Sequence, residues 1–184
     1  MEDDAVVSRR TMLAAGAAGL AGVSAFGAEV PPAVAPVFSV REFGARGDGV
    51  ADDTESVQAA VDAAVKAKGG RVHFPSGSYR LTKTITIASS DRLDLTGDGF
   101  SSVLLHAGPE HCLAWQEGSA CRESSVRDLC IAAAGQSKDP GIAAIACLGG
   151  VERSLFSHLL LTGGDIRMGS GILTRGVADT TALI

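Results

Sequence analysis

One segment of the chain carries apolar residues at the spacing of an α-helix. From Thr54 onward they follow the i, i+3, i+4 pattern that lines one helix face, at Val57, Ala60, Val61, Ala64 and Val65. Carboxylates at Asp52, Asp53 and Glu55 stand where this helix would begin, and side chains there can accept hydrogen bonds from free backbone N–H groups. We therefore predict a helix over about residues 54–68 and interpret the carboxylates as its caps, not as a metal or catalytic site.

After this helix, apolar and polar residues alternate in short runs. The alternating pairs are Val72 and Phe74, Ile85 and Ile87, Leu93 and Leu95, and Val103 and Leu105. Glycine, serine and aspartate residues interrupt the runs, which is typical of short strands joined by tight turns. One helix followed only by such strands excludes a doubly wound α/β sheet.

The apolar pattern also repeats along the chain. An offset of 30 residues aligns Val126, Leu129 and Ile131 with Phe156, Leu159 and Leu161, and Gly141-Ile142 with Gly171-Ile172. Each coil of a solenoid must place its inward residues over those of the coil below. The pattern predicts an all-β parallel β-helix. An antiparallel sandwich is the alternative, and the lack of Asn-Gly or Asp-Gly hairpins between long adjacent strands counts against it.

Two sequence motifs resemble a known family. They are FGARGDGVADDTESVQAAVDAA from Phe43 to Ala64 and GGRVHFPSGSY from Gly69 to Tyr79. Both are similar to the opening of the pectate-lyase-superfamily domain of rhamnogalacturonase- and epimerase-like proteins. The resemblance implies a right-handed parallel β-helix whose N-terminal end is covered by the helix. It also implies a polysaccharide-directed lyase, glycoside hydrolase or epimerase. Tailspike-like phage proteins share the motif, so a non-catalytic surface module that binds carbohydrate is the alternative.

The N-terminus has the pattern of an export signal. Arg9 and Arg10 precede an apolar stretch rich in Ala and Gly, which is typical of a twin-arginine signal; an ordinary secretory signal with a chance arginine pair is the alternative. The stretch is short and only mildly apolar, which argues against a permanent membrane span. The division this predicts is a signal peptide over 1–27, a linker over 28–37 and the β-helix domain over 38–184. We expect a periplasmic or extracellular protein whose export partner is the twin-arginine machinery.

Charge and cysteine content narrow the classes of partner. The net charge is −5 and no basic stripe is present, so a nucleic-acid partner is not expected. Cys112, Cys121, Cys130 and Cys147 show no zinc-ligand spacing. We favour buried free thiols over disulfide bridges for these four residues.

The resemblance implies a longer domain than this chain provides. Related domains usually continue for several more coils, and the chain ends on apolar Leu183-Ile184 without an evident cap. We therefore expect a β-helix truncated at its C-terminus, with most of the catalytic centre beyond Ile184. An uncapped last coil presents unpaired strand edges, so self-association is also expected.

Candidate site residues follow from the 30-residue offset. It stacks Asp128 on His158, and Asp165 with Arg167 follows one turn later. Polysaccharide cleavage requires carboxylates or a base that converge on one face of several coils. These four residues are the candidates for such a groove, and exposed polar side chains of strands and turns are the simpler interpretation. No cofactor is evident, and a calcium ion is compatible with the chain only if the parent protein is a lyase. We interpret His73 as an outward strand residue without a role, and Asp94 and Asp98 as turn residues.

Overall fold

A computed structural model describes residues 35–88, 90–134, 142–162 and 170–175. The predicted signal peptide, with Arg9 and Arg10, and the C-terminal Leu183-Ile184 lie outside the described residues. The helical elements described are α1 (Thr54–Lys66) and two short 3-10 turns, η1 (Val40–Phe43) and η2 (Gly99–Ser101). The strands described are β1 (Val37–Ser39), β2 (Asp48–Asp52), β3 (Gly70–Phe74), β4 (Gly77–Leu81), β5 (Ile85–Ile87), β6 (Ser90–Asp91), β7 (Leu93–Gly97), β8 (Ser102–His106), β9 (Leu113–Trp115), β10 (Ala120–Arg122), β11 (Ser125–Ala133), β12 (Ala143–Cys147), β13 (Gly150–Glu152), β14 (Leu155–Thr162) and β15 (Ser170–Thr174).

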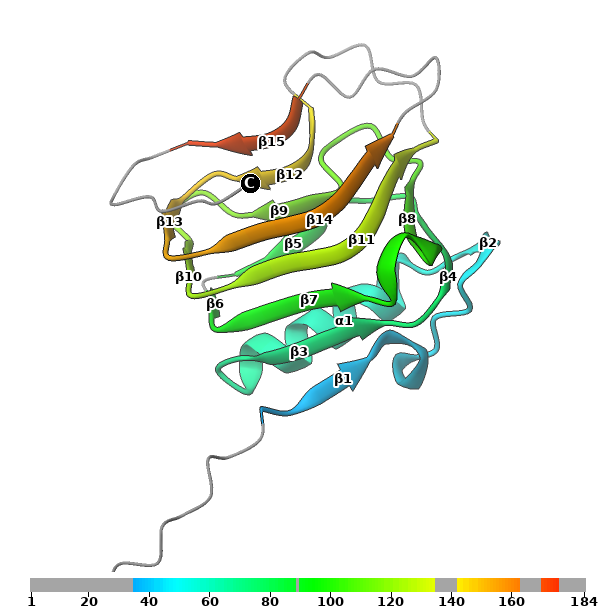
Figure 1. The fold of residues 1–184 in the computed structure, drawn as a ribbon, viewed down its shortest axis with the longest axis horizontal. Helices are drawn as coiled ribbons and strands as arrows, with labels where there is room; N and C mark the ends of the chain where they lie inside the picture. The colour runs from blue at the N-terminus through cyan, green and yellow to red at the C-terminus, as the bar shows by residue number, and fades with distance from the viewer. Residues whose placement is uncertain (1–34, 89, 135–141, 163–169, 176–184) are drawn as a thin grey trace, which may run out of the picture. The chain divides into compact units, whose positions relative to one another are not determined.

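These strands form the walls of a parallel β-helix, as predicted. In the largest sheet, β1, β3, β7, β11 and β14 lie side by side, and β2, β4 and β8 continue it to the second half of β11. A second sheet has the order β6-β10-β13, and a third the order β5-β9-β12-β15. After the first coil, which has α1 in place of strands for the second and third sheets, the coils rise one above another (Figure 1).

The strand register confirms most of the predicted repeat. Val126 lies beside Phe156, and the two apolar positions that follow on β11 also pair with β14 at an offset of 30 residues. The predicted pairing of Ile142 with Ile172 is wrong, because Ile172 instead pairs with Ile145. Coil length changes with the turns between strands: Arg71 pairs with Asp94, only 23 residues further on. One sequence offset therefore cannot align every wall.

Apolar side chains fill the interior of the coils. The largest side chains buried there are Trp115, Tyr79, Phe74, Leu81, Ile85, Ile87, Leu93, Leu95, Leu104, Leu113, Leu129 and Ile131. Their spacing places every inward residue over an inward residue of the coil below, so the core is continuous along the axis. All four cysteines are buried and free, as predicted, and Cys112, Cys121 and Cys147 pack in this interior.

Helix α1 closes the N-terminal end of the β-helix. Its buried face packs beneath the first coils (Figure 1). Gln58 takes the place of a strand neighbour for β5, because its side-chain amide donates to the carbonyl of Thr86 at 2.8 Å and its Oε1 accepts from the amide of Thr86 at 2.9 Å. An exposed strand edge can pair with other chains. The helix thus satisfies and covers an edge that would otherwise be open. Among the described residues, no helix has the length and apolar character needed to cross a membrane.

The acidic pair before α1 does more than begin the helix. Asp52 accepts hydrogen bonds from the amide and hydroxyl of Thr54 and from the hydroxyl of Thr82. The predicted cap at Asp53 is wrong: its side chain makes no capping hydrogen bond to the helix. It instead accepts hydrogen bonds from the amides of Arg46 at 2.7 Å and Gly47 at 2.9 Å, and is 2% exposed. Asp53 therefore fastens the preceding glycine-rich loop to the helix.

Replacing Asp53 by alanine tests this role. The Asp53→Ala variant leaves two amides without an acceptor, so the free energy of unfolding should fall by about 2–4 kcal/mol. Glu55→Ala is the control, because Glu55 is exposed in the same helical turn, and it should change stability by under about 0.5 kcal/mol. Urea denaturation of both variants provides the measurement. Equal, small effects would show that Asp53 is only a helix-start residue.

Candidate functional site

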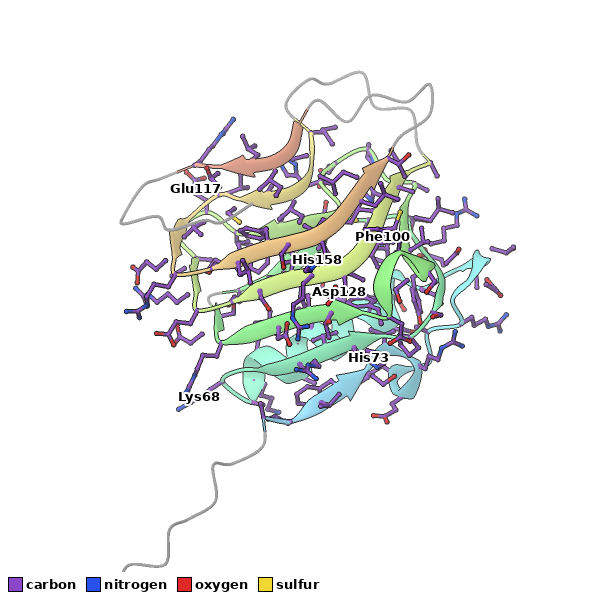
Figure 2. All side chains as sticks on the ribbon, viewed as in Figure 1. Lys68, His73, Phe100, Glu117, Asp128 and His158 are labelled. Atoms are coloured by element: carbon purple, nitrogen blue, oxygen red, sulfur yellow. The ribbon has the colours of Figure 1, made fainter. Side chains whose placement is uncertain are left out.

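The outer surface of the β3-β7-β11-β14 wall gathers hydrogen-bonding side chains from four consecutive coils. The strand register sets two rows: Arg71, Asp94 and Ser125 in the first, and His73, Thr96, Arg127 and Ser157 in the second. Figure 2 shows His73, Asp128 and His158 along this wall, from the lower coils to the upper ones. We call this surface the polar face, defined by Arg71, His73, Asp94, Asp98, Ser125, Arg127, Asp128, Ser157 and His158.

A backbone kink in each of the two upper strands shapes the polar face. Asp128 has a φ of 56° and His158 a φ of 49°, in the left-handed region that few residues other than glycine adopt. Val126 and Leu129 both point into the core, so the kink leaves two consecutive side chains, Arg127 and Asp128, between them on the outside. A regular strand would turn every second side chain inward. The kinks therefore double the density of outward groups at this level.

Gly97 makes room for the kink in the next coil. A Cβ atom at this position would lie 2.5 Å from the carbonyl oxygen of Asp128 and 2.7 Å from Cδ2 of Leu129. Both contacts are closer than real side chains allow. The glycine at the end of β7 thus allows the close approach of β11 where it changes direction.

Asp94 is the centre of a charged network on the polar face. It accepts hydrogen bonds from Arg71 Nε at 2.9 Å, from Arg127 Nη2 at 2.8 Å and from Ser125 Oγ at 2.5 Å. Partial burial alone would raise the pKa of Asp94, but the hydrogen bonds from Arg127, Ser125 and Arg71 outweigh it and hold this pKa below its ordinary value. Asp94 is therefore ionised at neutral pH and joins three coils.

Asp128 extends this network to the next coil. Arg127 Nη1 lies 3.2 Å from Asp128 Oδ2, and His158 Nδ1 lies 3.6 Å from Asp128 Oδ1. The side chain of His158 is 77% exposed and that of Asp128 is 33% exposed. The structure thus brings together the two residues that the 30-residue offset stacks, with the imidazole open to solvent.

A second carboxylate–histidine pair lies lower on the polar face. His73 Nε2 and Asp98 Oδ1 are 2.8 Å apart, and Asp98 also accepts a hydrogen bond from the amide of Ser76 at 3.0 Å. The hydrogen bonds from His73 and from the Ser76 amide hold the pKa of Asp98 below its ordinary value. Asp98 is in a turn, as expected, but its side chain is part of the polar face.

Residues 37–113 match the family described as "Rhamnogalacturonase A/epimerase, pectate lyase-like". Alginate lyase 7 of Azotobacter vinelandii is 58% identical over 45 residues, which are 24% of this chain and 5% of that protein. Plasmin and fibronectin-binding protein A of Streptococcus pneumoniae is 41% identical over 59 residues, which are 32% of this chain and 8% of that protein. Among solved structures, the A-module of the Azotobacter vinelandii mannuronan C-5 epimerase AlgE6 superposes with a TM-score of 0.55 at 20% identity, covering 79% of this chain and 43% of that one.

Residues 37–113 belong to this pectate lyase-like family. The structural likeness to the epimerase module, at 20% identity, shows the fold of the domain. The chain spans less than a tenth of the length of the two curated relatives. Asp128 and His158 lie beyond the residues that the family description matches.

Only part of the predicted site lies within the described residues of the pectate lyase-like domain. Asp165 and Arg167 lie outside the described residues. Asp94, interpreted from the sequence as a turn residue, is instead inside β7 and anchors the network. His73 points outward as predicted, but it pairs with Asp98 and is not without contacts. The signal that sequence reasoning missed was the 23-residue coil, which stacks Arg71 against Asp94.

The described part of the pectate lyase-like domain offers no evident metal site. No three His, Cys, Asp or Glu side chains converge there as ligands. The carboxylate of Asp94 is already bonded to Arg71 and Arg127. The polar face therefore does not fit a calcium ion at Asp94, and we assign no chemical step to one.

Proposed function

We propose that the protein is an exported, polysaccharide-active member of its family, and that its polar face contacts a uronate polysaccharide of the alginate class. The observation that carries this proposal is the exposed Asp128–His158 pair beside Arg127, on a wall that continues over four coils. A row of planar donors and acceptors along several coils suits the repeated hydroxyl and carboxylate groups of a sugar chain. The names of the alginate lyase and of the epimerase module suggest the class of substrate.

Recognition on the polar face would depend on hydrogen bonds more than on net charge. The face carries two guanidinium groups, on Arg71 and Arg127, and three carboxylates, on Asp94, Asp98 and Asp128. With neutral histidines these charges nearly cancel. Long-range attraction for a polyanion is therefore small, and binding should change little with ionic strength.

The geometry favours lyase or epimerase chemistry over hydrolysis. Both reactions begin when a base removes the proton beside a uronate carboxylate, and His158, next to Asp128, is the exposed basic group. A hydrolase needs a carboxylic acid that can donate a proton, whereas Asp94 is held ionised by two arginines. A calcium ion, if the parent protein is a lyase, would have to come from ligands outside those described.

A non-catalytic surface module that binds carbohydrate is the second candidate. The pneumococcal relative, named for binding plasmin and fibronectin, favours it, because the segment similar to this chain belongs there to a protein named for binding. Arg127 also favours it, since its ion pairs with Asp94 and Asp128 leave it unavailable to neutralise a uronate carboxylate during proton removal. Binding and turnover therefore need separate measurements.

Binding is tested with a conservative change on the polar face. Asp128→Asn retains the left-handed backbone, which asparagine tolerates, but loses a charged acceptor. We expect it to weaken the binding of an oligomannuronate about tenfold in a calorimetric titration. Glu123→Gln is the matched control, because Glu123 also has a positive φ and an arginine partner, Arg153, but lies in the turn between β10 and β11. Equal losses in both variants, or no binding by the wild type, would refute the proposed contact surface.

Turnover is tested by the ultraviolet absorbance of unsaturated products. We expect the 184-residue chain to bind the oligomannuronate without cleaving it, because Arg127, the cation beside Asp128, is already paired with Asp94 and Asp128. An increase in absorbance that disappears in His158→Ala would show that this chain is itself a lyase. His111→Ala is the control for loss of a histidine elsewhere.

Export is tested at the arginine pair. If Arg9 and Arg10 form a twin-arginine signal, replacing both with lysine should leave the precursor in the cytoplasm. Cell fractionation and immunoblotting provide the measurement. Normal export of the double variant would refute the twin-arginine assignment and favour an ordinary secretory signal.

A further inference from the structure

Two of the four buried cysteines stand at the two ends of one coil. Cys121 is the central residue of β10, Cys147 is the last residue of β12, and their exposed fractions are 1% and 0%. β13, the strand that follows β12, stacks directly on β10. The chain from Cys121 to Cys147 therefore makes nearly one circuit of the β-helix, and it returns to the starting wall at β13.

The coil below shows that side chains at these two positions meet. Cys121 pairs with Ser90, and Cys147 pairs with Trp115. In that lower coil, Trp115 Nε1 donates a hydrogen bond to Ser90 Oγ at 3.0 Å across the interior. Because the strands stack in parallel, Cys121 and Cys147 occupy the same two positions in the coil above. There the side chains are thiols, and each of Cys121 and Cys147 lies close enough to the other to shift its pKa.

The corner between β12 and β13 keeps the two ends of this coil close. A Cβ atom at Gly149 would lie 1.7 Å from the carbonyl oxygen of Ser119. The backbone of Gly149 thus lies directly against the residue before β10. This contact limits how far Cys147 can move from Cys121.

The surroundings make the two thiols chemically different. The neighbouring thiol of Cys147 lowers the pKa of Cys121 in spite of burial, and the hydroxyls of Ser154 and Ser124 add to this effect. The same thiol–thiol contact raises the pKa of Cys147, and burial raises it further. Cys112 has no such partner, and burial raises its pKa to about 12. Of these thiols, Cys121 forms a thiolate most readily, and the thiolate is the reactive form.

We propose that Cys121 and Cys147 are a disulfide-forming pair that closes this coil covalently under oxidising conditions. The Cys121 thiolate attacks one sulfur of a small disulfide such as oxidised glutathione, and one glutathione thiolate leaves. The Cys147 thiolate then attacks Sγ of Cys121, and the second glutathione thiolate leaves. Two cysteine thiols are oxidised and one glutathione disulfide is reduced. The two cysteine protons go to the released thiolates.

Burial determines when this reaction occurs. Both thiols are inaccessible once the coil is packed, so the attack on glutathione belongs to folding or to local opening of the coil. Once formed, the bond would be protected by the same burial. It would restrict the unfolded chain over one coil length and so stabilise the fold.

The test is to refold the 184-residue chain with mixed oxidised and reduced glutathione. Alkylation under denaturing conditions should then label Cys112 and Cys130 only, and peptide mass spectrometry should find a Cys121–Cys147 link. The oxidised protein should melt roughly 5–10 °C above the reduced protein. Alkylation of all four cysteines, or a link that includes Cys112 or Cys130, would overturn the proposal.

Matched variants separate the bond from simple packing. Cys121→Val introduces the residue type found at the equivalent position of the next coil, Val151. This variant should abolish the redox-dependent change in melting temperature. Cys130→Ser should retain that change, because Cys130 is not part of the pair. A redox-dependent shift that persists in Cys121→Val would also overturn the proposal. If that variant fails to fold, the number of alkylated cysteines in the refolded wild type still shows whether the Cys121–Cys147 bond forms.

Discussion

In-register stacking of parallel strands is the constraint on which this structure depends. Each inward residue must lie over an inward residue of the coil below, because only then is the apolar interior continuous. The same register aligns outward residues, so Arg71, Asp94 and Ser125 form a row without being near in sequence. The same register places Cys121 over Ser90 and Cys147 over Trp115, two residues that contact each other.

The polar face arises where the chain departs from a regular strand. The left-handed kinks at Asp128 and His158 turn two successive side chains outward in each strand, and Gly97 provides the space beneath the first of them. Backbone strain of this kind persists only where surrounding contacts hold it. Here the hydrogen bonds of β11 with both neighbouring strands do so. The pectate lyase-like fold thus supplies the register, and the kinks supply the density of polar groups.

The sequence predicted the features that depend on local spacing. The helical period of Val57, Ala60 and Val61 located α1, and the 30-residue offset stacked Asp128 on His158. Contacts set by variable coil lengths were not predictable in this way. Asp53 looked like a helix cap because its partners, the amides of Arg46 and Gly47, meet it only after the loop folds back. Asp94 was missed for the same reason, since its arginines come from coils at different offsets.

The central claim is that the polar face contacts the polysaccharide, and the four histidines of the chain test it most directly. His73 and His158 lie on the polar face, whereas His106 is buried and His111 Nδ1 accepts a hydrogen bond from the amide of Ala143. In an NMR titration with an oligomannuronate, the imidazole signals of His73 and His158 should shift, and those of His106 and His111 should stay in place. Shifts confined to His106 or His111, or none at saturating ligand, would contradict this claim.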